Sequence, residues 1–300
     1  AAKFDLSFGY KFSNNSRYVN FGAAVSGGSD SMALVMFLQQ FLKKYSPWFV
    51  KTFNYAPGLV AFHVDHKIRE ESTREAAEIR KKLIANGILC SSLTMDWEAD
   101  FPPEKKTQAL LRRRRYELLL QGCRKKNVNF LFLGHNWNDQ IETMLMRIAK
   151  SSTLIGLSGM KPASVHNKEI FLVRPLLHFH KENIVATCRY NHWRWWEDPS
   201  NCDPKYTRNL LRSSLAQSKL STTELLSLYK STFLLNKQIE KAVISVVNRT
   251  TKFMWQYGAF TLHRQTFLEY NNDPALQLFS VRWALQLICR HPNRVSETLC

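Results

Sequence analysis

A short segment in the first part of the chain combines two glycines, three serines and one acid, in the order Ser26, Gly27, Gly28, Ser29, Asp30 and Ser31. The glycines let the backbone turn tightly and direct successive N–H groups toward an anion. A helix predicted to follow adds the positive end of its dipole. The serine hydroxyls can donate to phosphate oxygens, and the carboxylate of Asp30 can hold Mg²⁺. Because no Gly-Lys-Ser/Thr follows, the segment predicts a phosphate-binding loop that is not a Walker A loop.

Two acids further along the chain suggest proton or amine chemistry. Asp139 and Glu142 are three positions apart on a predicted helix and therefore share a face. They can bind an amine or relay a proton from one. The alternative is that they are ordinary acids near a helix N-terminus. His135, just before them at a predicted strand end, contacts phosphate or caps a loop.

His63 and Asp65 lie two positions apart on a predicted strand and share one of its faces. With His66 next to them they suggest a metal site, but no third ligand is evident. We therefore favour a contact to the nucleotide for His63 and Asp65.

Arginines provide the cationic part of the predicted site. Four of them, 112–115, cover one helical turn and cannot all share a face. Arg112 and Arg115 can face the site, whereas the two between them face solvent or RNA phosphate. Arg208 and Arg212, four residues apart, are predicted to bind phosphate. Three tryptophans at 193, 195 and 196 favour a core position over base stacking.

Strand-like and helix-like stretches alternate through the first two thirds of the chain. The predicted strands are 18–25, 59–64, 88–95 and 130–134, and the predicted helices are 31–44, 72–86, 107–126 and 138–149. Residues 45–58, with two prolines, are predicted to form a loop. This alternation predicts an α/β fold with a parallel sheet covered on both faces, in which ligands bind beyond the carboxyl ends of the strands.

The pattern changes after about residue 215. Helices are predicted at 222–247 and 274–289, with a short strand at 259–262. We therefore expect a catalytic domain over residues 1–215 and a smaller, mainly helical domain over residues 216–300.

The charge of the chain points to a polyanionic partner. Lys and Arg number 42 against 24 Asp and Glu, a net charge of +18 over 300 residues. Nucleic acid is the first expectation and an anionic membrane surface the second. We expect no transmembrane span, because no long apolar run occurs. The six cysteines form no close pair and predict buried, reduced thiols.

Seven motifs in order resemble one family. SGGSDS resembles the PP-loop of the ATP pyrophosphatases. Four further segments are similar to motifs of the tRNA(Ile)-lysidine synthetases: AFHVDHKIREEST, QALLRRRRY, GHNWNDQIETMLMRI and EDPSNCDPKYTRNLLR. GLSGM and RPLL occur in the order of the family. Trp137-Asn138 departs from the usual Ala-Asp, so one carboxylate of the family is lost.

The resemblance implies a PP-loop, adenine nucleotide alpha-hydrolase-like domain that uses ATP and Mg²⁺. It implies adenylation of the wobble cytidine in a tRNA(Ile) with a CAU anticodon, followed by attack of free L-lysine to give lysidine. Catalytic roles fall on Asp30, Asp139, Glu142 and Arg112, with the loop, His63, Asp65 and His135 binding ATP. Residues 216–300 would recognise the tRNA.

Three alternatives stay open at this point: a tRNA thiolase of the same superfamily, a non-catalytic RNA-binding protein on this fold, and an amidotransferase-type synthetase. Paired cysteines and a glutaminase domain, which the first and third require, are not evident. High basicity and many aromatic residues favour a mitochondrial location, with the bacterial cytoplasm as the alternative. The oligomeric state is left open, a homodimer included.

Overall fold

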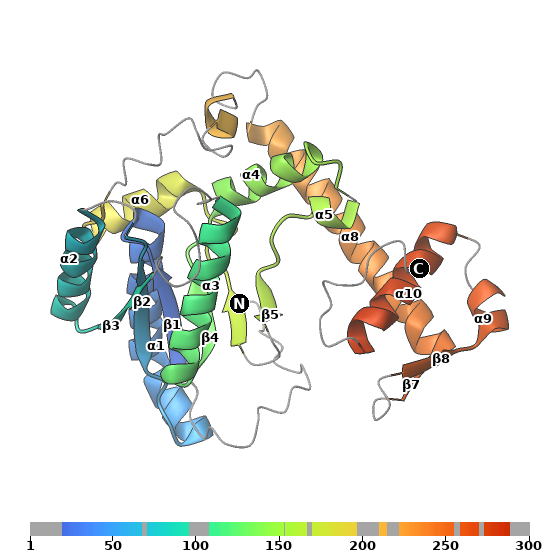
Figure 1. The fold of residues 1–300 in the computed structure, drawn as a ribbon, viewed down its shortest axis with the longest axis horizontal. Helices are drawn as coiled ribbons and strands as arrows, with labels where there is room; N and C mark the ends of the chain where they lie inside the picture. Colours follow the sequence, from blue (N-terminus) through green and yellow to red (C-terminus); the bar gives the residue numbers. More distant parts are fainter. Residues whose placement is uncertain are drawn as a thin grey trace. The chain divides into compact units, whose positions relative to one another are not determined.

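A computed structural model describes most of the chain (Figure 1). The described residues are 20–67, 71–95, 108–152, 154–166, 170–196, 210–214, 222–254, 259–269 and 273–288.

Within these ranges, six strands form one sheet in the order β3-β2-β1-β4-β6-β5. The strands are β1 (Asn20–Val25), β2 (Leu59–Asp65), β3 (Leu89–Thr94), β4 (Val128–Leu133), β5 (Ala163–His166) and β6 (Ile170–Val173). All neighbouring pairs are parallel except β5 and β6. The chain runs from β1 outward to β3 and then returns to place β4 on the other side of β1. The carboxyl ends of β1 and β4 therefore form the topological switch point of the sheet, where ligands bind in such folds.

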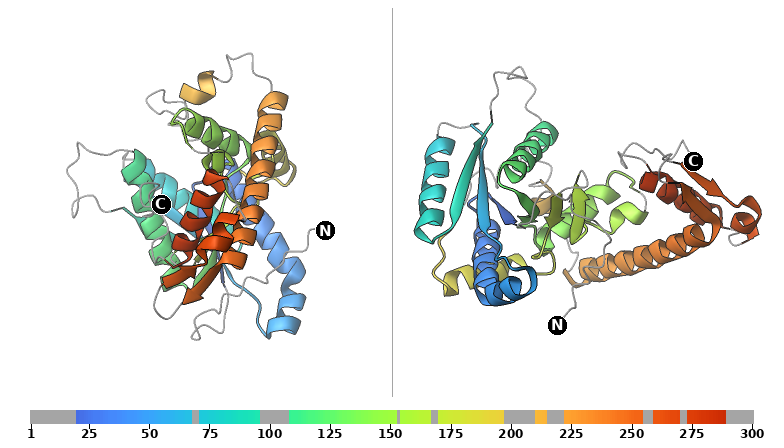
Figure 2. Two further views of the ribbon diagram at one scale, coloured as in Figure 1. Left: turned by 90° about the vertical axis from the view of Figure 1, so that its right-hand side faces the viewer. Right: turned by 90° about the horizontal axis from the view of Figure 1, so that it is seen from below.

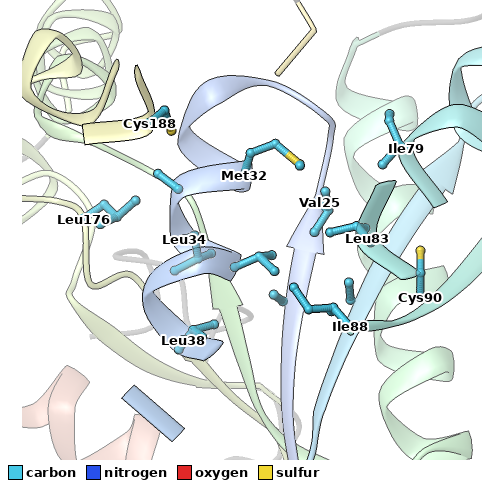
Figure 3. Close-up of a cluster of buried hydrophobic side chains, with 14 of the residues drawn as sticks. Val25, Met32, Leu34, Leu38, Ile79, Leu83, Ile88, Cys90, Leu176 and Cys188 are labelled. Carbon is cyan, nitrogen blue, oxygen red and sulfur yellow. The ribbon is translucent and has the colours of Figure 1, made fainter. Parts of the chain in front are cut away.

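Helices cover both faces of the sheet, as the sequence predicted. The helices that pack on it are α1 (Ser29–Phe53), α2 (Glu71–Ala85), α3 (Gln108–Lys125) and α6 (Lys181–Tyr190). Helix α4 (Trp137–Ile148) follows β4, and α5 (Leu154–Leu157) belongs to a separate compact unit. Side chains of α1, α2 and α6 form one core with the sheet (Figure 3), and those of α3 form a second core with its other face. Ala61 belongs to the first core and Phe62 to the second, as the alternation of a strand requires. Figure 2 (right) shows α2 and α3 on opposite sides of the strands.

Helix α1 is longer than the sequence predicted. We expected a loop over residues 45–58, but α1 continues through Pro47 to Phe53 and ends at Asn54, which adopts a left-handed conformation. A proline inside a helix removes one hydrogen bond but need not end the helix when packing supports it. Aromatic side chains provide this support. The Phe41 and Tyr45 rings lie 4.7 Å apart, and Phe49 contacts Phe21 of β1 at 6.2 Å.

The short elements β5, β6 and α6 were not predicted. Strands of four residues carry too little alternation to stand out from a loop. The antiparallel β5–β6 pair also adds one antiparallel edge to a sheet that we expected to be wholly parallel. The remaining strands and helices of the sheet domain agree with the predicted positions to within a few residues.

The chain divides into two compact units: residues 1–143 with 160–218, and residues 144–159 with 219–300. The second unit contains α5, α8 (Thr222–Thr250), α9 (Arg264–Glu269), α10 (Pro274–Ile288) and a hairpin of β7 (Thr251–Met254) and β8 (Ala259–Leu262). Its core gathers Val243, Val247 and Ala284. Asn236 of α8 donates to the Ser158 hydroxyl after α5 at 3.1 Å. No described helix has both the length and the apolar character that crossing a membrane requires.

Candidate active site

The loop between β1 and α1 has the tight turn that its glycines predicted. Gly27 has a φ of 92°, a conformation that favours glycine. The Ser31 hydroxyl donates to the Gly28 carbonyl at 2.9 Å and lies 3.2 Å from the backbone nitrogen of Ser26. Gly28 precedes the helix with no side chain to cap it. The first N–H groups of α1 therefore remain oriented toward a ligand at this point, as anion binding requires.

Asp30 forms the centre of the site. Its carboxylate accepts a hydrogen bond from the Asn136 amide at 3.0 Å and an ion pair from the Lys181 ammonium at 2.5 Å. Asn136 follows β4 and Lys181 begins α6, so the carboxylate joins three segments at the switch point. Because Asp30 keeps 22 % of its side chain exposed, a ligand can reach it.

The start of α4 approaches the loop closely. A Cβ at Gly134 would lie 3.1 Å from backbone atoms of Asp30 and Ser31, so a larger residue there would press on the backbone of the loop. Asn136 caps α4: its side chain accepts from the Asp139 N–H at 3.1 Å, and Asp139 accepts from the Asn136 N–H at 3.0 Å. This reciprocal pair is a capping box. One oxygen of Asp139 therefore has a structural role, the alternative that the sequence left open.

Glu142 is the most deeply buried acid of the predicted site. Its side chain is 4 % exposed and accepts from Arg212 at 2.5 and 3.3 Å. Burial works against the charge of Arg212, but the hydrogen bond and charge of Glu142 outweigh it and raise the pKa of Arg212. Asp139 and Asp30 contribute in the same direction. Glu142 therefore pairs directly with Arg212, and the charges of Asp139 and Asp30 favour the same guanidinium.

His63 and Asp65 have structural partners. The Nδ1 of His63 lies 2.8 Å from the Val25 carbonyl oxygen, and burial lowers the pKa of the imidazole. Burial alone would raise the pKa of Asp65, but hydrogen bonds from the backbone of Lys67 and the hydroxyls of Ser72 and Thr73 lower it. His63 thus joins β2 to the end of β1, whereas Asp65 holds Lys67 and the start of α2. A contact of either with ATP stays a prediction.

The arginines of α3 divide as follows. Arg112 is exposed and lies over the Tyr116 ring at 5.2 Å, and Arg115 is partly buried. Arg113 and Arg114 both pair with Glu117, at 2.9 and 3.1 Å. His135 is partly buried between Gly134 and Asn136. Arg208 lies outside the described residues.

The sequence reasoning missed Asn136 and Lys181. An Asn followed three positions later by Asp, at the start of a helix, is a capping signal that could have identified Asn136. Lys181 is a cation in the first turn of α6, where the helix dipole disfavours positive charge. A lysine in that place indicates a carboxylate partner, which is Asp30.

Mg²⁺ fits this site only as part of an ATP complex. Among the residues that the structure describes, no three His, Cys, Asp or Glu side chains gather as a metal cluster. Asp30 is available as one carboxylate ligand, and Mg²⁺ is commonly bound by one or two carboxylates together with substrate phosphates.

Comparison with known proteins agrees with this geometry. Residues 7–219 match the PP-loop domain family. The chain therefore belongs to the PP-loop family of ATP-using domains.

Similar proteins carry a more specific name, tRNA(Ile)-lysidine synthase. Those of Anaplasma marginale and Bacillus licheniformis are 35% and 37% identical over 199 and 193 residues, which is 66% and 63% of this chain. The protein of Brucella ovis is 37% identical over 196 residues, 65% of this chain. The matches span 40%, 38% and 41% of these relatives, so the chain spans well under half of their length.

A solved structure shares the fold. The U34-tRNA thiolase NcsA from Methanococcus maripaludis superimposes with a TM-score of 0.55 at 17% identity, over 73% of this chain and 72% of the thiolase. At this identity the likeness is one of fold alone.

The predicted mitochondrial location is wrong. The relatives come from Anaplasma, Bacillus and Brucella, which are bacteria, and so point to a bacterial cytoplasm, the alternative considered. Basicity and aromatic content misled the prediction, because any protein that binds RNA can have them.

Proposed function

We propose that the chain is the PP-loop part of a tRNA(Ile)-lysidine synthetase. The observation that carries the proposal is a set of contacts beside the loop at the switch point of the sheet: Glu142 pairs with Arg212, and Asn136 contacts both Asp30 and Asp139. Relatives with that name and the PP-loop match support it.

The proposed reaction has two displacements. In the first, O2 of the wobble cytosine attacks the α-phosphorus of ATP, and the bond to the β-phosphate breaks to release pyrophosphate. In the second, the amine of L-lysine attacks carbon 2, the C2–O bond breaks, and AMP leaves with the oxygen. The amine loses a proton to complete lysidine.

The roles that we propose for the residues of the site follow from their charges. The loop amides, the N-terminus of α1 and Lys181 bind the phosphates, and Arg212 and Arg208 neutralise charge that develops on them. Asp30 would hold Mg²⁺, which would neutralise phosphate charge when bound with ATP. Glu142 and Asp139 attract the lysine ammonium or accept its proton. Arg112 and Arg115 face the tRNA side of the site.

We further propose that residues 1–215 are catalytic and that residues 216–300 recognise the tRNA. The C-terminal region has cations on its helices and hairpin at Lys237, Lys241, Arg249, Lys252, Arg264 and Arg282. Phosphate contacts from such a surface would supply affinity, and contacts to bases would supply selectivity.

The thiolase alternative is not favoured. Burial raises the pKa of the Cys90 thiol to about 11 and of the Cys123 thiol to about 12, so neither is a ready nucleophile.

The deciding experiment incubates the full chain with ATP, L-lysine and CAU-anticodon tRNA(Ile), followed by mass spectrometry of the nucleosides. Lysidine formation is expected. A sulfur-containing base would instead support the thiolase. No change in the tRNA, together with no release of pyrophosphate, would support a non-catalytic RNA-binding protein.

A further inference from the structure

A pocket of about 440 Å³ lies beside the loop and contains none of the predicted site residues. It is lined by Glu78 and Lys82 of α2 and by Arg194, Trp195 and Trp196, which follow α6. The backbone N–H of Trp196 donates to the Gly27 carbonyl at 3.0 Å, so this wall of the pocket is bonded to the phosphate-binding loop.

The pocket contains more positive than negative charge. The Lys82 ammonium lies 3.5 Å from the centre of the Trp196 ring. Burial, and then the charge of Arg194, lowers the pKa of Lys82, which shows that the two cations are near each other. Among the described residues that line the pocket, Glu78 is the one acid, and its carboxylate lies 3.8 Å from the Arg74 guanidinium. Two neighbouring cations with so little negative charge between them favour an anionic ligand.

The tryptophans add flat apolar surface to the same pocket. Both indoles are partly buried and pack against the core beneath α1 and α2. Their rings are therefore held in place by the fold, so that ordering them on binding costs little. A rigid aromatic surface next to paired cations is suited to a base stacked beside its phosphate.

We propose that this pocket binds one nucleotide of an RNA, with its phosphate on Lys82 and Arg194 and its base on the exposed surface of Trp195. The proposal rests on the proposed function in one respect, that the substrate is a tRNA. A free nucleotide offers the same phosphate and base, so the experiment separates the two sources.

The test compares the full chain with Arg194→Ala and Lys82→Ala in tRNA binding at several salt concentrations. Each variant should lower tRNA affinity by about threefold and reduce the slope of log affinity against log salt by about one. Lys81→Ala is the matched control, because Lys81 is exposed, lies on the same helix and carries the same charge. The tRNA affinity of Lys81→Ala should exceed that of either pocket variant. Thermal melting checks that all variants fold.

Equilibrium dialysis with labelled ATP then counts the nucleotide sites. One ATP in both the wild type and Arg194→Ala, with reduced tRNA affinity, identifies the ligand as RNA. Two bound ATP molecules in the wild type and one in Arg194→Ala would identify the ligand of the pocket as a free nucleotide. Equal tRNA affinities and slopes for all three variants, with equal ATP counts, would overturn the proposal.

These outcomes are independent of the lysidine assay. If the wild type makes no lysidine but tRNA binding depends on Lys82 and Arg194, the proposed function fails and the pocket stands. If lysidine forms and the pocket variants bind tRNA as Lys81→Ala does, the proposed function stands and the proposal for the pocket fails.

Discussion

At the scale of single residues, one contact at the phosphate-binding loop that the sequence did not predict is the ion pair between Lys181 and Asp30. The Lys181 ammonium holds Asp30 at 2.5 Å, yet both side chains are partly exposed, 39 % and 22 %. Ion pairs with such exposure stabilise a fold by at most about 1 kcal/mol. We therefore expect the charge of Lys181 to matter more for phosphate binding than for stability.

We predict that Lys181→Met weakens ATP affinity by about tenfold, because a charge-assisted contact to phosphate is lost. The free energy of unfolding should change by less than about 1 kcal/mol. Isothermal titration with ATP and urea unfolding measure the two quantities. Lys181→Arg should restore most of the affinity. A large loss of stability with unchanged ATP affinity would show that the pair is structural.

His63 makes a pH-dependent contribution to stability. The Val25 carbonyl can only accept, so the neutral ring carries its proton on Nδ1, and burial lowers the pKa from its usual 6.5. The unfolded chain then binds more protons than the folded one below about pH 6.5. Stability supplied by the neutral ring is therefore complete above pH 6.5 and is lost as the pH falls below it.

We predict that His63→Asn, which keeps a donor near the Nδ1 position, has a flatter stability profile between pH 7.5 and 5.5. The wild type should lose up to about 1 kcal/mol more than the variant over this interval. Urea unfolding at both pH values gives the difference. Parallel profiles would mean that His63 titrates normally in the folded protein.

Glu142 and Arg212 act as a pair. We predict that Glu142→Gln leaves ATP binding intact but lowers lysidine formation, because the carboxylate that handles the amine is lost. Arg212→Met should slow adenylation as well. A double-mutant cycle on lysidine formation should give a coupling of about 1–3 kcal/mol. Additive effects would indicate that the two side chains work separately.

At the scale of elements, Pro47 is unusual because it lies inside helix α1. The proline removes a backbone hydrogen bond within α1, and the aromatic side chains on both sides keep the helix intact. We predict that Pro47→Ala stabilises α1 by about 1–3 kcal/mol. Amide hydrogen exchange over residues 43–53 should slow accordingly, and exchange in α2 should not. Unchanged exchange in α1 would show that packing already offsets the proline.

The sequence predicted the elements with strong periodicity and misplaced those decided by tertiary contact. The parallel sheet follows from strand and helix alternation, and the loop after β1 follows from its glycines. The extent of α1 depends on Phe49 reaching Phe21, a contact between residues 28 positions apart in the sequence, which local patterns do not reveal. The contacts of Asn136 and Lys181 with Asp30 also escape local patterns, because each joins residues more than 100 positions apart, although the local capping signal marks Asn136 itself.

At the scale of the whole molecule, the net charge of +18 favours a polyanionic partner such as the proposed tRNA. We predict that tRNA affinity falls steeply with salt, whereas ATP affinity falls much less, because phosphate contacts along RNA release many counterions. The double variant Lys241→Ala/Lys252→Ala should lower the salt slope by about two. Lys43→Ala/Lys44→Ala, an equally exposed pair on α1, is the control. Equal slopes for both variants would contradict a recognition role for residues 216–300.

The second unit is built from two separate stretches of the chain, residues 144–159 and 219–300, and this affects how the chain folds during synthesis. Ser158 follows α5, and its hydrogen-bond partner Asn236 is 78 positions later. A ribosome adds roughly 5–20 residues per second, so α5 emerges roughly 4–16 seconds before this partner. In that interval the following segment supplies β6, which pairs with β4 and extends the sheet. The nascent chain therefore builds the sheet first and must keep a short apolar helix from aggregating until α8 leaves the exit tunnel.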